Sequence, residues 1–171
     1  TLIGEYTLRA GSAEGVNVSS LNIDFSAITG WTNAKLYKVN DDGTETQIGS
    51  TISTPSVTDD ANSLAVGGQL NIAASATKTL RLRADGSSTA VTLNTDIDAA
   101  DITASGLQSG TTLAGNVPPA QVIGSTITVR ASGTLFVETD TSAPVEAVVH
   151  ASETGRELTR VKLSSQFEAI K

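Results

Sequence analysis

Three carboxylates stand close together between positions 96 and 101, where Asp96, Asp98 and Asp101 are separated by Ile and Ala residues. Closely spaced carboxylates in loops suit Ca²⁺, because this cation takes about six to eight oxygen ligands. The stretch does not follow the regular EF-hand loop pattern. Two interpretations stay open: a structural calcium site at these three residues, or ordinary turn and capping carboxylates. We expect no required cofactor, with calcium as the one candidate.

Acid–base catalysis finds little support in the sequence. A Ser-His-Asp site would have to use His150, the single histidine, and no G-x-S-x-G nucleophile motif accompanies it. Glycoside hydrolysis needs two acids at a sugar-binding cleft. Aromatic residues, which commonly stack on sugars, make up 4% of this chain. We predict that His150 ends a strand without a catalytic role and that the protein is not an enzyme.

Trp31 is the single tryptophan, and it stands between Gly30 and Thr32 in a stretch that we expect to be a loop. An exposed loop tryptophan would suit a sugar ligand. An adhesin or carbohydrate-binding module is therefore the alternative function. A Lys–Asn isopeptide crosslink also stays open, because it depends on spatial contacts.

The charge and composition narrow the classes of partner. The net charge is −7 and the 11 Lys and Arg residues are scattered, whereas phosphate binding needs a clustered basic face. No apolar run approaches the roughly 20 residues of a membrane-spanning helix. We expect neither nucleic-acid binding nor membrane insertion. A Cys-free, acidic chain rich in Ser and Thr fits an extracellular protein of a bacterial or archaeal cell surface.

The elements that would position these residues are predicted to be strands. In the stretch 79–84, Leu80, Leu82 and Ala84 alternate with polar residues, which indicates one buried and one wet face. Asn-Asp-Asp-Gly at 40–43 predicts a hairpin turn, and Ser-Ser at 19–20 predicts a bulge. Further strands are expected at 63–72, 89–93, 125–130, 134–138, 145–150 and 158–163, while 98–107 is either a strand or a helical turn. This spacing predicts an all-β fold, a β-sandwich of Greek-key or jelly-roll type with an extended C-terminal strand.

The Gly-Asn-Val-Pro-Pro segment at 115–119 is the best candidate boundary. We expect a sandwich core at residues 1–115 and a strand-rich extension at 116–171. The extension has few large apolar residues and would bury too little surface to fold alone. It is therefore expected to complete the sandwich and to link it to the next subunit or module.

The end of the chain is similar to its beginning. When Leu163 is laid over Leu8, Val161 falls on Tyr6 and Leu158 falls on Ile3. After a one-residue gap, Glu168 falls on Glu14 and Ile170 falls on Val16. Two strands with the same apolar spacing would fit equivalent positions in a sheet.

Several loose strand-and-turn patterns follow one another along most of the chain. They are LRAGSAEGVNV at 8–18 followed by LNIDF, AKLY at 34–37, TKTLRLRAD at 77–85, and GTLFVE at 133–138 leading to APVEAVV at 143–149. In this order they resemble the tandem β-sandwich modules of large secreted bacterial surface proteins, including surface-layer-like proteins of candidate-phyla bacteria. In such proteins the stretch equivalent to 145–163 runs directly into the first strand of the next module. The resemblance implies either one excised stalk repeat or a subunit whose tail is completed by another copy.

We therefore expect a structural protein that assembles with copies of itself, and with other cell-surface components as further candidate partners. The expected assembly strand carries Leu158, Val161, Leu163, Phe167 and Ile170. Added to the open sheet edge of a second copy, it would gain affinity from main-chain hydrogen bonds. Such a head-to-tail contact propagates into a filament, a pilus-like fibre or a surface layer. A tail folded back on its own sandwich is the alternative.

Overall fold

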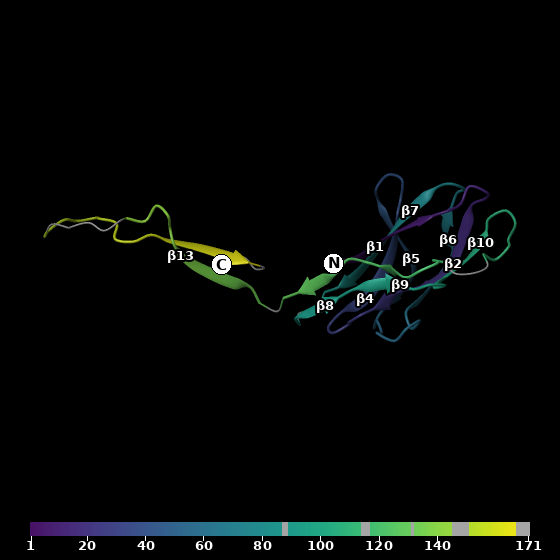
Figure 1. The fold of residues 1–171 in the computed structure, drawn as a ribbon, viewed down its shortest axis with the longest axis horizontal. Coiled ribbons are helices and arrows are strands. Elements are labelled where there is room, and N and C mark those ends of the chain that lie inside the picture. Colours follow the sequence, from purple (N-terminus) through teal and green to yellow (C-terminus); the bar gives the residue numbers. More distant parts are fainter. Residues whose placement is uncertain (87–88, 114–116, 131, 145–150, 167–171) are drawn as a thin grey trace. The chain divides into compact units, whose positions relative to one another are not determined.

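A computed structural model describes residues 1–86, 89–113, 117–130, 132–144 and 151–166. Every regular element in this described part is a β-strand, so the predicted all-β class is confirmed (Figure 1). No helix long and apolar enough to cross a bilayer is found in it. The chain divides into two compact units, Thr1–Val129 and Arg130–Lys171.

Unit 1 is built from antiparallel sheets that pack together. The four-stranded sheet has the order β1 (Leu2–Arg9), β7 (Thr77–Asp85), β4 (Thr32–Val39) and β5 (Glu45–Ile52). The three-stranded sheet has the order β10 (Ile102–Gly106), β2 (Val16–Asn22) and β6 (Ser63–Ile72). Smaller sheets join β11 (Val122–Ile123), β9 (Thr95–Ile97) and β3 (Asp24–Phe25), and join β12 (Ile127–Val129) to β8 (Val91–Leu93). Strands distant in sequence pair side by side, as in Greek-key sandwiches.

The core of unit 1 comes from the inward faces of these strands. On β7 the alternation predicted from the sequence holds, since Leu80, Leu82 and Ala84 are buried. On β2 the buried residues are Val18 and Leu21, three positions apart. This spacing is possible because the register with β6 shifts between Val18 and Ser20, as the predicted bulge requires. Aliphatic side chains dominate this core.

The two sides of the sandwich differ. On one side β5 and β6 contact each other. On the other side, β1 and β10 are the end strands of their sheets among the described residues. A strand at the end of a sheet leaves main-chain hydrogen-bonding groups unpaired along one edge unless another segment covers it. The edge of β10 is covered in this way, because the Leu113 amide donates to the Ala104 carbonyl and the Ile102 amide donates to the Val117 carbonyl.

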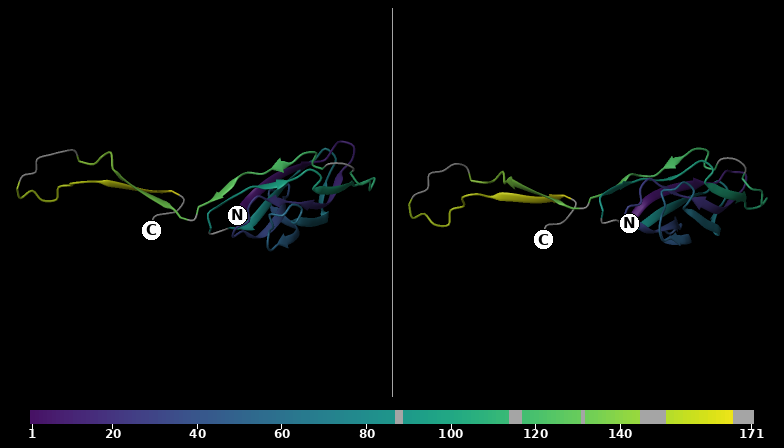
Figure 2. Two further views of the ribbon diagram at one scale, coloured as in Figure 1. Left: turned by 60° about the horizontal axis from the view of Figure 1, so that its bottom comes forward. Right: turned by 90° about the horizontal axis from the view of Figure 1, so that it is seen from below.

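The described part of unit 2 contains one hairpin, β13 (Thr134–Thr139) paired antiparallel with β14 (Val161–Gln166) (Figure 2). Its loop end is fastened by the Asp140 amide, which donates to the Arg160 carbonyl at 3.0 Å. The Arg160 guanidinium pairs with Glu157. The expected strand at 145–150 lies outside the described residues.

Two expectations about this end of the chain need correction. The boundary lies between residues 129 and 130 and not at 115, because β11 and β12 pair with β9 and β8 of unit 1. The tail strand begins at Val161 and not at Leu158, and it is already paired on one edge with β13. Leu158 precedes the strand and is 79% exposed.

Candidate functional site

The acidic cluster predicted near position 98 exists, with a different membership. Asp24, Asp98 and Asp101 each place one carboxylate oxygen within 4.8 Å of the others. Asp24 comes from β3, which pairs with β9, and Asp98 and Asp101 come from the turn between β9 and β10. In that turn the Asp98 amide donates to Asp101 Oδ2 at 2.6 Å. Ala100 adopts the left-handed region with φ of 74°.

Asp96 is not a member of the cluster. It lies directly opposite Asp24 in the β3–β9 pair, but its Oδ2 accepts a hydrogen bond from Gln121 Nε2 at 2.6 Å. The sequence did not predict Asp24 as a member of the cluster, because Asp24 is distant from Asp98 and Asp101 along the chain. Only the pairing of β3 with β9 brings it to them.

The electrostatics of the cluster show crowded negative charge. Burial, with a contribution from the Asp101 carboxylate, raises the pKa of Asp24 to about 6. Burial also raises the pKa of Asp98 and of Asp101. Asp24 Oδ1 accepts from the Asp60 amide at 3.2 Å, whereas its buried Oδ2 has no hydrogen-bond partner. Chemically, such a set of oxygens suits a hard cation.

Among the described residues, Trp31 does not form a second site for chemistry. Trp31 is 4% exposed and belongs to the core, so its ring is not available to stack on a sugar. The expectation that Trp31 is exposed in a loop and binds a sugar is therefore wrong. In the turn after Ile28 the Trp31 amide donates to the Ile28 carbonyl at 2.9 Å, and this turn directs the ring inward. His150 lies outside the described residues. Lys78 forms an ion pair with Asp41.

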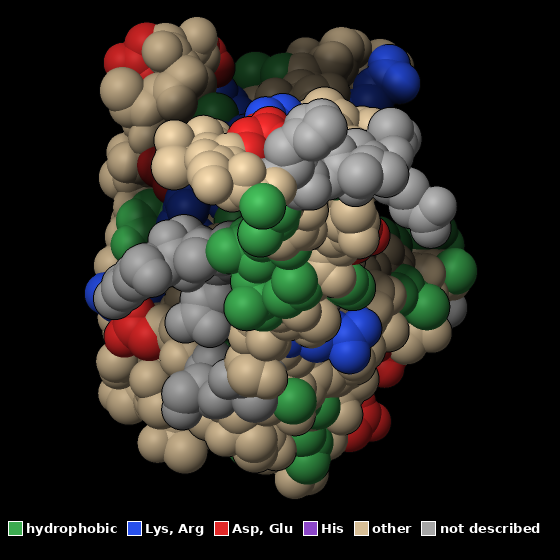
Figure 3. All heavy atoms as spheres, turned by 90° about the vertical axis from the view of Figure 1, so that its left-hand side faces the viewer, with side chains coloured by type: hydrophobic (Ala, Val, Ile, Leu, Met, Phe, Trp, Pro, Cys, Tyr) green, Lys and Arg blue, Asp and Glu red, His purple; other side chains and the backbone are tan. Residues whose placement is uncertain are grey.

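The second candidate site is the face of the β13–β14 hairpin. Side chains directly opposite each other in an antiparallel pair share a face. Val137 lies opposite Leu163, and Leu135 and Val161 lie on the same face, one on each strand. These four side chains, the apolar face of the hairpin, are each between 52% and 63% exposed. In the view of Figure 3, hydrophobic side chains (green) reach the surface at several places. Phe136, Glu138 and Lys162 occupy the opposite face.

β1 is the N-terminal counterpart of β14 and has the same apolar spacing. Its apolar side chains are buried, whereas those of β14 are exposed. In β1, Ile3 and Tyr6 are buried and Leu8 is partly buried, and Val16 on β2 is also partly buried. In β14 the equivalents of Tyr6 and Leu8 are Val161 and Leu163, which are exposed. Phe167 and Ile170, also expected in the assembly strand, lie outside the described residues. The pattern that faces a core in unit 1 therefore faces outward in the hairpin.

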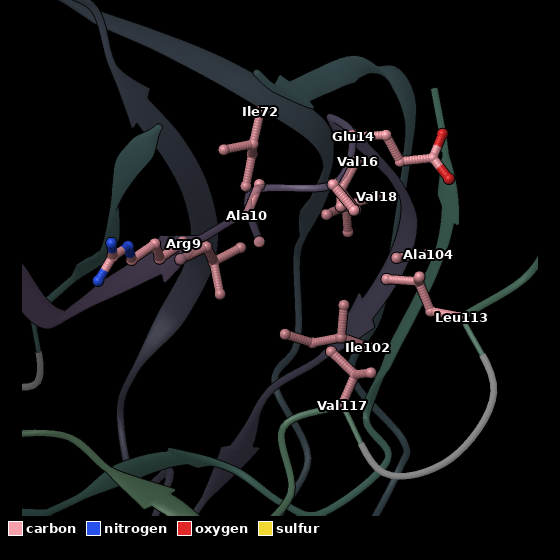
Figure 4. A pocket seen from close by; sticks show the side chains of 13 residues that line it. Arg9, Ala10, Glu14, Val16, Val18, Ile72, Ile102, Ala104, Leu113 and Val117 are labelled. Carbon is pink, nitrogen blue, oxygen red and sulfur yellow. The ribbon is translucent and has the colours of Figure 1, made fainter. Parts of the chain in front are cut away.

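A groove lies along the open side of unit 1. It has a volume of about 300 Å³ and is lined mainly by aliphatic side chains from β1, β2 and β10. Figure 4 shows Ala10, Val16, Ile102, Ala104 and Val117 pointing toward it. Glu14 stands at its rim and accepts hydrogen bonds from the Gln108 and Ser109 amides, both at 3.0 Å. These bonds hold the pKa of Glu14 below its usual value.

Comparisons with known proteins returned nothing for this chain. No protein family, no curated protein and no solved structure matches it.

Proposed function

We propose that this protein is a structural, non-catalytic component of an extracellular surface assembly. It joins copies of itself head to tail by adding the β13–β14 hairpin of one copy to a sheet edge of the next. The product is a filament, a pilus-like fibre or a surface layer. The observation that carries the proposal is the exposed apolar face of a hairpin that has no further strand beside it among the described residues.

An isolated two-stranded hairpin is at best marginally stable in water, and a sheet normally needs a third strand or a packing surface. The exposed apolar face also makes the free hairpin less stable, because covering apolar surface gains about 25 cal/mol of free energy for each Å² that is removed from water. Addition to another sheet satisfies both needs. It also protects an edge that would otherwise invite uncontrolled pairing.

The assembly is expected to propagate because donor and acceptor are different surfaces. The hairpin lies in unit 2, and β1, which has no described strand beyond it in its sheet, lies in unit 1. Contacts between unlike surfaces form open chains unless the rotation between subunits closes a ring. An adhesin or carbohydrate-binding function has lost its motivating residue, since Trp31 is buried.

The test uses Val137→Asp, which places a charge on the apolar face of the hairpin. Sedimentation velocity over a range of concentrations, with negative-stain imaging, should show wild-type assemblies that this variant loses. Ser164→Asp adds the same charge on the opposite face of the hairpin and is the matched control. A wild-type chain that stays monomeric at every concentration, or a Val137→Asp variant that assembles normally, would contradict the proposal.

We also propose that Asp24, Asp98 and Asp101 hold a calcium ion that fastens β3 to the turn after β9. Three observations support this: the convergence of carboxylate oxygens, the raised pKa values of all three acids, and the buried Asp24 Oδ2 without a donor. A divalent cation would remove the mutual repulsion of these charges. Its role in this proposal is rigidity, because a cation at this position joins segments that are distant in sequence.

A further inference from the structure

The main-chain hydrogen bonds of β1 show which of its residues face its open edge. At the end of the β1–β7 ladder the Ala10 amide donates to the carbonyl of Ala76, the residue directly opposite it. Hydrogen-bonded pairs alternate along an antiparallel ladder, so every second residue of β1 directs its main-chain groups away from β7. These residues are Glu5, Thr7 and Arg9. Among the described residues β1 pairs with β7 alone, which leaves this edge without a strand.

The outer edge of β14 follows the same alternation. The Asp140 amide donates to the carbonyl of Arg160, one residue pair beyond the β13–β14 ladder. The β14 residues that direct their main-chain groups away from β13 are therefore Val161, Leu163 and Ser165. Val161 and Leu163 also belong to the apolar face of the hairpin. The residues that can bond to a further strand are thus the same residues whose side chains need cover.

The direction of the added strand decides which way this apolar face turns. In an antiparallel pair, residues that direct their main-chain groups at each other lie directly opposite and share a face, so Leu163 would turn to the side of the exposed Thr7. In a parallel pair, such a residue bonds instead to the two neighbours of the residue opposite it. Leu163 then lies opposite Leu8, bonds to Thr7 and Arg9, and turns its side chain to the side of the groove, which Leu8 lines.

The far wall of the groove extends beyond β10, whereas the sheet on the near side ends at β1. Leu113 and Val117 lie along the outer edge of β10, to which they are joined by main-chain hydrogen bonds. Both line the groove beside Ile102 and Ala104, and Leu113 is 38% exposed (Figure 4). No described strand lies beyond β1 to face them. A strand added to β1 would therefore cover an apolar wall.

We propose that β14 of a second copy of this chain adds to the open edge of β1 as a parallel strand, with Leu163 opposite Leu8 and Val161 opposite Tyr6. β13 follows as the next strand outward. The apolar face of the hairpin then covers Leu113 across the groove and continues the core of unit 1. This inference rests on the proposed function and names the acceptor of the assembly.

The main-chain groups of the two edges match in this register. The Val161 amide donates to the Glu5 carbonyl, and the Thr7 amide donates to the Val161 carbonyl. The Leu163 amide donates to the Thr7 carbonyl, and the Arg9 amide donates to the Leu163 carbonyl. These bonds would give affinity, while the side chains that enter the groove would fix the register.

The register is also the one in which the end of the chain is similar to its beginning. Two strands with the same pattern match residue by residue only when they run in the same direction, so the likeness favours parallel addition. On the outward face Arg160 falls opposite Glu5, which brings opposite charges together. Lys162 falls opposite the uncharged Thr7.

The absence of cysteine in the chain allows a disulfide test without background. Neighbouring strands lie about 4.7–4.9 Å apart, so directly opposite Cα atoms are within the range of a disulfide. Lys162→Cys protein is mixed with differently tagged Thr7→Cys protein and oxidised, and a crosslinked heterodimer is expected. Arg9→Cys replaces Thr7→Cys to test the register, and its yield should be several-fold lower. Thr46→Cys, an exposed position on β5 at the other edge of the same sheet, is the control.

A further variant distinguishes the two strands of the hairpin. Phe136→Cys replaces Lys162→Cys and reports addition through β13, because in the proposed arrangement β14 separates β13 from β1 by more than a disulfide can span. Capture of Thr7→Cys by Lys162→Cys, with little product from Phe136→Cys or with Thr46→Cys, supports the inference. Equal or stronger capture through Arg9→Cys would overturn the register.

The outcomes separate this inference from the proposed function. If the wild-type chain assembles but Thr7→Cys is captured by Phe136→Cys or by neither strand, the inference is wrong and the proposed function stands. If the wild type does not assemble at all, the proposed function itself fails. A crosslink within single chains of a Thr7→Cys/Lys162→Cys double variant, with no heterodimer in the mixture, would identify the chain's own hairpin as the occupant and overturn the inference.

A substitution on the far wall tests the groove without changing β1. Leu113→Asp places a charge on a partly exposed lining residue that the hairpin would cover, and it should weaken assembly by roughly tenfold or more. Val57→Asp adds the same charge at an exposed position that does not line the groove. Equal assembly of the two variants would overturn the groove as part of the acceptor.

Discussion

Val137 on β13 and Leu163 on β14 lie directly opposite each other in the hairpin, and their side chains are 63% and 52% exposed. A pair of aliphatic side chains at this position contributes little while it faces water on one side. In unit 1, by contrast, Leu8 at the corresponding position of β1 packs against the core. The pair is therefore suited to a surface that becomes buried.

The exposed pair should be detectable with a hydrophobic dye. In dilute, unassembled protein we expect Val137→Ser/Leu163→Ser to lower the fluorescence of bound 8-anilinonaphthalene-1-sulfonate by roughly twofold, because this dye binds exposed apolar surface. Val57→Ser, which removes an isolated exposed valine of unit 1, should change the signal little. Equal signals from the double variant and the wild type would show that the apolar face does not offer a continuous surface.

Local sequence patterns predicted much of unit 1. The alternation around Leu80, the bulge near Ser20 and the turn before Gly43 are all encoded within a few residues, and all three are present. Each depends on side-chain period or on backbone freedom, and Gly43 has the positive φ of 83° that its turn requires.

The parts that the sequence did not predict depend on long-range pairing. Asp24 joins Asp98 only through the β3–β9 ladder, and Asp96 is withdrawn by a bond to Gln121. The beginning of the tail strand at Val161 depends on its pairing with Thr139 of β13. A local pattern contains no information about the partner strand, and register decides which face is covered.

The hydroxyl of Tyr6 provides a test of how β1 is anchored to the rest of unit 1. It donates to Thr95 Oγ1 at 2.8 Å, both residues are buried, and burial raises the pKa of Tyr6 to about 12. Tyr6→Phe should lower the free energy of unfolding by about 1 kcal/mol in urea titrations. Tyr37→Phe, on the half-buried outer face of β4, should cost less than about 0.5 kcal/mol. If Tyr6→Phe costs no more than this control, the bond does not anchor β1.

Glu14 offers a test of the groove rim that is independent of assembly. Its carboxylate accepts from the amides of Gln108 and Ser109 and from the Ser109 hydroxyl. Glu14→Ala removes these acceptors, so both amides should exchange with deuterium roughly tenfold faster. The Leu113 amide, which donates to the Ala104 carbonyl at 2.8 Å, should keep its rate and is the internal reference. Unchanged exchange at Gln108 and Ser109 would mean that the loop holds its place without Glu14.

The raised pKa of Asp24 predicts an unusual pH dependence of stability. The folded chain holds a proton on Asp24 up to about pH 6, whereas an unfolded chain releases it near the ordinary value of 3.8. Between these values the folded state binds more protons, so the free energy of unfolding falls as pH rises. In a chelating buffer, urea titrations should show lower stability at pH 7 than at pH 4.5. Asp24→Asn should flatten this dependence, while Asp96→Asn should keep it.

Calcium should reverse the same trend if the acidic cluster binds it. A cation that binds the folded chain alone stabilises it by an amount that rises with its concentration relative to the dissociation constant. Because the ion needs ionised carboxylates, the gain should be larger at pH 7 than at pH 4.5, and it should disappear in Asp24→Asn. Isothermal titration calorimetry and the unfolding midpoint, with Mg²⁺ as the comparison ion, measure the gain. A wild-type midpoint that does not respond to Ca²⁺ at pH 7, together with a flat calorimetric titration, would leave the cluster as a crowded turn whose carboxylates destabilise the fold at neutral pH.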